Sequence, residues 1–292
     1  MPRQLQAGQR AELYIIDVIT GDKTLRYASE SILIEAPNWS PDGRTIVVNG
    51  DGGLYRLGVD GGELEQIDLG AVPAINNDHV LSPDGRQAYV SSDDGHIYAV
   101  ALAGGDIRRI TNDRGADFRH YLHGTSPDGT LLAYIGMRIR DDGVTTNVYT
   151  IPSAGGHETQ LTDDSFPDDG AEFSPDGQWI YFNSERGSTI AGHAQLFRMP
   201  VGGGDPEQLS DDERVNWFPH PSPDGDSLVY VSFPPGTEGH PANLDIIVRM
   251  RDKGGQVRDI AAVFGGQGTM NVPSWDPSGT KIAIVAYPLR AS

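Results

Sequence analysis

The chain has 292 residues, with 41 acidic side chains against 22 lysines and arginines, a net charge of −19 at pH 7, and no cysteine. This charge balance argues against nucleic acid and anionic membrane surfaces as partners, because both are bound through clustered cations. The lack of cysteine excludes disulfides, thiolate zinc sites and a cysteine nucleophile. With 37 glycines, 20 prolines and no long helical pattern, the composition favours many short strands joined by tight turns.

Targeting features are sparse in this sequence. Residues 1–10 lack the apolar stretch of a secretory signal, and no run of about 18 apolar residues is present that could span a membrane as a helix. The sequence as written therefore predicts a cytoplasmic protein without membrane insertion, and a periplasmic one if a leader has been removed.

The first predicted elements are two strands near the amino end. Residues 13–18 and 24–27 read as strands and flank a Thr-Gly-Asp turn at residues 20–22. This pair matches the half that is missing from the last unit of the chain, where residues 282–286 form a strand with no outer pair. We expect about residues 11–28 to pair with residues 270–288 and to close a ring.

One four-residue turn recurs along the chain. Its proline presets φ, its aspartate can accept hydrogen bonds from the nearby backbone, and its glycine takes the left-handed conformation that closes the turn. Intact Ser-Pro-Asp-Gly copies begin at Ser40, Ser82, Ser126, Ser174 and Ser222, and an altered Asp-Pro-Ser-Gly copy begins at Asp276. The serines lie 42 to 48 residues apart, a period that is typical of four-stranded propeller blades.

A strand is predicted after every turn, followed by a loop and a second strand pair. The strands after the turns are residues 45–48, 87–90, 131–134, 179–182, 228–231 and 281–284. In the second pairs an aromatic residue, which we expect to pack between blades, precedes a Gly-Gly turn; these aromatics are Tyr55, Tyr98, Tyr149 and Phe197. The prediction is an all-β protein: residues 1–292 form one six-bladed β-propeller domain of four-stranded blades, the last blade closed by the N-terminal strands.

The repeat resembles the TolB-type propeller repeat, a relative of the WD repeats. The features that carry the resemblance are the turn with its preceding aromatic at Trp39 and Phe173, the strand after it, and the Gly-Gly turn; they cover about residues 11–288. The resemblance implies a periplasmic protein that binds a lipoprotein within an envelope-spanning complex. TolB proteins also have an N-terminal α/β domain, and we expect it to be missing here, because only ten residues precede residue 11, where the resemblance begins.

The candidate site is predicted on one face of the ring. Connections between second and third strands share a face, here called the top face, with the segments that cross between blades; the Ser-Pro-Asp-Gly turns lie on the opposite face. Three second-to-third connections are long and are predicted as loops, at residues 136–147, 183–195 and 232–243. Loops on a rigid scaffold often carry binding sites.

Polar residues gather in the blade-crossing segments, which are predicted to come just before the inner strands. Imidazoles beside carboxylates suit a divalent metal or an acid–base pair, although no compact metal motif such as His-Glu-x-x-His is present. The candidate ligand-binding residues at the channel mouth and top face are Asp78, His79, Arg119, His120, His123, Asp168, Glu172, His193, Asn216, His220 and His240.

The sequence features are consistent with two main functions. The first is a non-catalytic binding or scaffold propeller that presents the top face to a protein, a peptide or a small polar ligand, with no cofactor and no catalytic residue. The alternative is a metal-dependent carbohydrate lyase or hydrolase, by resemblance to oligogalacturonate lyases, which would add a divalent metal. A purely structural subunit of a larger assembly is a third class.

Overall fold

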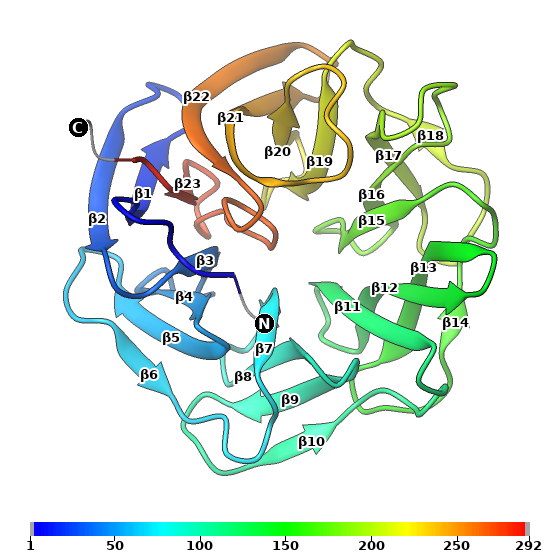
Figure 1. Cartoon of the computed structure of the whole chain (residues 1–292), viewed down its shortest axis with the longest axis horizontal. Helices are drawn as coiled ribbons and strands as arrows, with labels where there is room; N and C mark the ends of the chain where they lie inside the picture. Colours follow the sequence, from blue (N-terminus) through cyan, green and yellow to red (C-terminus); the bar gives the residue numbers. More distant parts are fainter. Residues whose placement is uncertain (1–2, 290–292) are drawn as a thin grey trace.

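The structure is a computed structural model that describes residues 3–289, in which antiparallel sheets are arranged as the blades of a ring (Figure 1). The first two blades are β3 (Ile34–Trp39), β4 (Thr45–Gly50), β5 (Gly53–Gly58) and β6 (Glu65–Ile67), then β7 (Ile75–Leu81), β8 (Gln87–Ser92), β9 (Ile97–Ala101) and β10 (Ile107–Arg109). The third and fourth are β11 (Phe118–Thr125), β12 (Leu131–Arg140), β13 (Gly143–Pro152) and β14 (Thr159–Gln160), then β15 (Asp168–Phe173), β16 (Trp179–Ser184), β17 (Gln195–Pro200) and β18 (Glu207–Gln208). The fifth is β19 (Val215–Pro221), β20 (Ser227–Phe233), β21 (Ala242–Asp252) and β22 (Val257–Gly266), and the sixth is β23 (Lys281–Ala286), β1 (Ala11–Asp17) and β2 (Lys23–Ser29).

The sixth blade joins the two ends of the chain. Strand β1 pairs with β23 from Glu12 opposite Ala286 to Asp17 opposite Lys281, and β2 covers the outer edge of β1. The inner position holds only an isolated bridge between Trp275 and Ile282. The all-β six-bladed propeller closed by N-terminal strands is confirmed, with the innermost strand of the last blade reduced to that bridge.

The repeated turns form a ring of their own on the face opposite the top face. In the intact copies the serine hydroxyl donates to the aspartate at 2.5 to 2.7 Å. The turn glycines have φ between +67° and +74°, as the left-handed position requires. Each glycine lies against the proline of the preceding turn, and Gly43 completes the circle by lying against Pro277. The turns are therefore structural.

One predicted loop is wrong. Residues 136–147 are not a loop, because β12 and β13 continue through them as a ladder that ends with Arg140 opposite Gly143. The β-branched residues Val144, Thr145 and Thr146 suit an extended strand. The hairpin of β12 and β13 therefore extends the third blade. Residues 185–194 and 234–241, within the other two predicted segments, do connect strands on the top face.

Clusters of buried apolar side chains fill the spaces between neighbouring blades. Among the aromatics expected to pack there, Tyr149 and Phe197 are buried, whereas Tyr55 and Tyr98 are only partly buried. The part of the chain that the structure describes contains no helix, and hence none that could cross a membrane. The blades thus form a packed frame around the channel, toward which the inner strands face (Figure 1).

Candidate functional site

The polar residues predicted to precede the inner strands are part of those strands. Asp78 lies in β7, His123 in β11 and Asp169 in β15. These strands, like β3 and β19, have an irregular register against the neighbouring strand, as at a β-bulge. A bulge breaks the strict alternation of side chains, and these three residues line a cavity at the channel mouth.

Left-handed backbone conformations occur in three of these irregular segments, and Ala36 in β3 has a φ of +51°. Gly170 in β15 has a φ of +68°, and Phe218 in β19 has a φ of +56°. A Cβ on Gly170 would come within 2.9 Å of Asn183 Oδ1, the atom that accepts the backbone N–H of Phe218 at 3.0 Å. Only glycine fits there without displacing a neighbour, and the backbone N–H of Gly170 in turn donates to the side chain of Asp169 at 2.8 Å.

Two imidazoles meet one carboxylate at the centre of the mouth. His123 Nε2 lies 2.8 Å from Asp169 Oδ1, and His240 Nε2 lies 3.5 Å from Asp169 Oδ2. The other ring nitrogen of His123 faces the carbonyl oxygen of Asn271 at 3.3 Å. Both nitrogens of His123 therefore face oxygen acceptors, which suits a doubly protonated, cationic imidazolium.

The charges of this cluster shift the pKa values of its members. Burial alone would lower the pKa of His123, but the charges of Asp169 and Asp78 outweigh it and raise the pKa to about 9. Burial would raise the pKa of Asp169, and the charge of His123 with the hydrogen bonds from His123 and His240 holds it far below its usual range instead. At neutral pH, His123 and Asp169 thus form an ion pair in which the imidazole is buried and the carboxylate is partly buried.

Asp78 is a second buried carboxylate at the mouth. It is only 5% exposed, and burial raises its pKa to about 6 despite the charge of His123. Within residues 3–289, its side chain accepts one hydrogen bond, from the Asn76 amide to Oδ2 at 2.7 Å, and it takes part in no ion pair.

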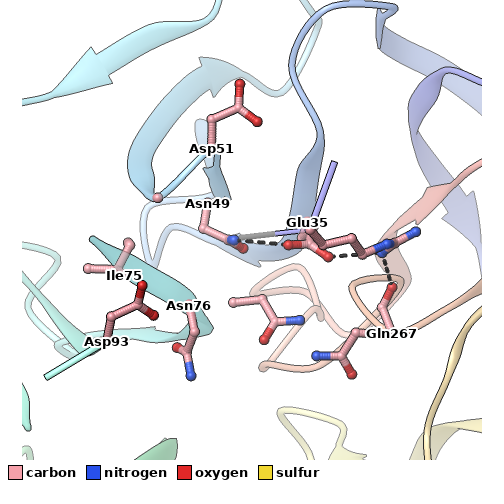
Figure 2. A pocket seen from close by; sticks show the side chains of 10 residues that line it. Glu35, Asn49, Asp51, Ile75, Asn76, Asp93 and Gln267 are labelled. Carbon is pink, nitrogen blue, oxygen red and sulfur yellow. Dashed lines mark hydrogen bonds and ion pairs between the residues drawn. The ribbon is translucent and has the colours of Figure 1, made fainter. Parts of the chain in front are cut away.

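These groups surround a cavity of about 460 Å³, within the usual range for small-ligand pockets. Its lining is Asn76, Asn77, Asp78, Tyr121, His123, Ile135, Met137, Thr146, Asp169, Phe218, His240, Gln267 and Asn271. A second cavity of about 220 Å³ shares Asn76, Asn77 and Gln267 with it and extends over the first and second blades (Figure 2). The mouth is therefore a continuous polar depression with an apolar wall.

The second cavity is lined by one ion pair and by two carboxylates that form no ion pair with any described residue. Arg3 donates to Glu35 at 2.9 Å, and burial raises the pKa of Glu35 despite that arginine. Asp51 and Asp93 also line this cavity, and Figure 2 draws no hydrogen bond or ion pair between them and the other residues shown. Arg119, predicted as a site residue, donates to the Asp93 carbonyl oxygen at 2.9 Å and lines neither cavity.

Another imidazole–carboxylate pair lies deeper in the channel. His220 Nδ1 is 2.5 Å from Glu172 Oε2, and its Nε2 is 3.0 Å from the Met270 carbonyl oxygen. Burial raises the pKa of Glu172, against the effect of His220. Glu172 faces a separate cavity of about 220 Å³ that is lined by turn prolines, among them Pro41 and Pro175. This pair belongs to the turn side of the channel and does not reach the mouth.

The remaining predicted site residues are engaged by protein groups away from the two cavities, most of them in contacts between blades. His79 Nε2 lies 3.5 Å from the Val47 carbonyl oxygen of the first blade. His120 is bonded to Gly95 of the second blade at 2.7 Å. Asp168 pairs with Arg186 at 2.7 Å. His193 contacts the Asp212 carbonyl oxygen at 2.9 Å, and Asn216 donates to Gln195 at 3.1 Å.

The structure thus brings Asp78, His123 and His240 together and leaves the other predicted residues elsewhere. Sequence reasoning chose Asp168 and missed Asp169, its neighbour, which occupies the centre of the cluster. The signal that could have found it is Gly170, because a glycine inside a strand pattern often marks a bulge. Gln267 and Asn271 were missed because they come from the irregular segment before β23.

The cluster does not have the arrangement of a metal centre. Within the described residues, no group of three or more His, Cys, Asp or Glu side chains is placed to hold a metal ion. The donor atoms of His123 and Asp169 face each other, and His240 Nδ1 is bonded to Gln267. A divalent metal would first have to break these contacts.

The fold and the mouth define a closed six-bladed β-propeller with a polar channel entrance. A family model described as the TolB beta propeller domain matches residues 124–286. The uncharacterized protein Atu1656 of Agrobacterium fabrum is 42% identical over 262 residues, which are 87% of this chain and 85% of that protein. The chain belongs to the TolB beta propeller domain family, and the resemblance seen in its repeats is confirmed.

Solved structures agree with this assignment. A protein of Agrobacterium tumefaciens provisionally named TolB is 38% identical, with a TM-score of 0.86 over 96% of this chain and 99% of that chain. Oligogalacturonate lyase in complex with manganese has a TM-score of 0.60 at 16% identity, over 90% of this chain and 73% of that chain. At such low identity the likeness to the lyase concerns the fold alone.

Proposed function

We propose that this protein is a non-catalytic binding propeller whose channel mouth takes a protein, a peptide or a small polar ligand. The observation that carries the proposal is the cavity of about 460 Å³ lined by Asp78, His123 and Asp169. Buried charged groups are costly unless they are paired, and clusters of them in a concave site are associated with ligand binding. A cytoplasmic location, with the periplasm as the alternative, stays a prediction.

The state of the histidines supports binding rather than acid–base catalysis. A general base needs a ring nitrogen within reach of a substrate proton. Both nitrogens of His123 face protein oxygens, and those of His240 face Gln267 and Asp169. These contacts fix the imidazoles as part of the cavity wall.

Blocking the mouth should abolish ligand binding. Asn76 lines both cavities and is half-buried, so Asn76→Trp is expected to fill the entrance. A ligand identified by thermal-shift screening should lose measurable binding to this variant by calorimetry. Gln178→Trp, at an exposed site beside a repeated turn on the opposite face, is the matched control and should bind as the unsubstituted protein does. Equal binding by both variants would contradict the proposal.

The metal-dependent lyase or hydrolase remains the alternative, and metal content separates the two. The fold likeness to a manganese-bound lyase favours it, while the pairing of the donor atoms with one another favours binding. We expect purified protein to contain less than stoichiometric divalent metal by elemental analysis, both as isolated and after dialysis against manganese. A stoichiometric ion that is lost in His123→Gln would support the lyase instead.

A further inference from the structure

The two cavities at the channel mouth are lined by more negative than positive side chains. Their lining residues include five carboxylates, from Glu35, Asp51, Asp78, Asp93 and Asp169, but Arg3 is the one arginine or lysine among them. Arg3 is neutralised by Glu35, and His123 is neutralised by Asp169. Among the described residues, Asp51, Asp78 and Asp93 form no ion pair, although the charge of His123 also acts on Asp78.

We propose that the channel mouth binds an organic cation, an ammonium or guanidinium group, with its charge placed against Asp78. This ligand class rests on the proposed binding function and makes it specific. Asp78 is almost fully buried and lines the larger cavity, yet it accepts a single side-chain hydrogen bond, to Oδ2. A buried carboxylate with spare acceptor capacity and no direct ion pair is stabilised by a cation that donates hydrogen bonds to it.

The wall beside Asp78 suits the carbon part of such a ligand. Tyr121, Phe218 and Met137 line the same cavity. Aromatic faces attract cations and also pack against alkyl chains, and methionine adapts to the shape of a ligand. The ring centroid of Phe218 is 5.1 Å from that of His240 and 5.8 Å from that of His123. The aromatic side chains and the charged cluster therefore belong to one site.

An organic cation fits better than a metal ion. Within the described residues, no group of three or more His, Cys, Asp or Glu side chains is placed to hold a metal ion, and in the larger cavity Asp78 offers the carboxylate that is not engaged by an imidazole. The amide groups of Asn76, Asn77 and Gln267, at the junction of the cavities, provide acceptors for the hydrogen atoms of an ammonium group.

Two sources of this cation can be separated by titration calorimetry at pH 7.5. One probe is spermidine, a small polyamine, and the other is a blocked Gly-Lys-Gly peptide. The same peptide with an acetylated lysine, which has lost its charge, is the neutral control. We expect at least one charged probe to bind, the acetylated peptide not to bind, and the affinity to fall as salt is raised.

Asp78→Asn tests the contact itself. The change keeps the shape and the acceptor for Asn76 but removes the charge, so the affinity for the charged probe should fall about tenfold to a hundredfold. Because an unpaired buried charge is also lost, the melting temperature at pH 7.5 should stay the same or rise. Asp60→Asn, at an exposed turn position, is the matched control and should change neither property.

The outcomes distinguish this inference from the proposed function. If neither charged probe binds, while a neutral ligand binds and is blocked by Asn76→Trp, the cation proposal fails and the binding function stands. If Asp78→Asn binds the charged probe as tightly as the unsubstituted protein does, the placement at Asp78 is wrong. Displacement of the probe by stoichiometric calcium or manganese would identify a metal site instead and overturn the proposal.

Discussion

Deletion of residues 1–22 is expected to abolish cooperative folding of the ring. The deletion removes β1, whose side chains Leu13, Ile15 and Ile16 are buried between the sixth blade and its neighbours. Burial of one such side chain is worth about 1.5–3 kcal/mol, so these three alone account for roughly 5–9 kcal/mol. That is comparable with the total stability of a typical domain, about 5–15 kcal/mol.

The measurement is thermal unfolding followed by near-ultraviolet circular dichroism, with light scattering to detect aggregation. A matched pair of point variants separates loss of the closing strand from a general effect of truncation. Leu13→Asp places a charge at a buried position of β1, the strand that closes the ring, whereas Ile19→Asp makes the same kind of change at a site that is 74% exposed. We expect the first to unfold the protein and the second to leave its melting temperature within a few degrees. A truncated protein with an unchanged melting temperature would contradict the closure of the ring by β1.

The stability of the protein should fall as the pH rises from about 6.5 to about 9, and His123 should be a main cause. In the folded state its pKa is raised to about 9, against about 6.5 in an unfolded chain. A raised pKa means that protonation of His123 favours the folded state. This contribution is complete below pH 6.5 and is lost as the pH rises through 9. At 1.4 kcal/mol per pKa unit, the loss is at most about 3 kcal/mol.

Chemical denaturation at pH 6 and pH 9 measures this effect. The free energy of unfolding of His123→Gln should depend less on pH than that of the unsubstituted protein, with the difference between the two proteins largest at pH 6. The charges of Asp78 and Asp169 act on the same imidazole, and His240 contacts the same Asp169 carboxylate, so the comparison with the unsubstituted protein is essential. His157→Gln, at an exposed histidine, is the control and should retain the full pH dependence. An identical slope for His123→Gln would exclude the ion pair with Asp169.

The fold could be predicted because its signals are local and repeated. Each turn needs proline, aspartate and glycine for reasons that act within four residues, and their recurrence sets the number of blades. The extended hairpin was missed although a local signal was present, since an Asp-Gly pair at 142–143 followed by β-branched residues favours a hairpin. In the structure the turn is Asp141-Asp142, and Gly143 begins the second strand. Length alone had suggested a loop there.

The candidate site was predicted less well because its geometry is not local. Asp168 and Asp169 are the same residue type at neighbouring positions, so the sequence does not distinguish them, but adjacent strand residues face opposite ways. The bulge at Gly170 decides which of them reaches the channel. Likewise His120 and His123 lie in one strand, yet His120 is hydrogen-bonded to Gly95 of the second blade, whereas His123 contacts Asn271 and lines the cavity at the channel mouth. Neither distinction follows from residue type or spacing.

The pairing of the first strand with the last affects how the chain folds during synthesis. Strand β1 leaves the ribosome well before β23, and Glu12 finds its partner Ala286 only after five complete blades have been synthesised. At about 5–20 residues per second, the apolar residues of β1 wait on the order of tens of seconds for their neighbour. During that time β1 presents an open edge that other chains can pair with. Biogenesis of this propeller should therefore be more sensitive to crowding and chaperone supply than its finished, closed ring suggests.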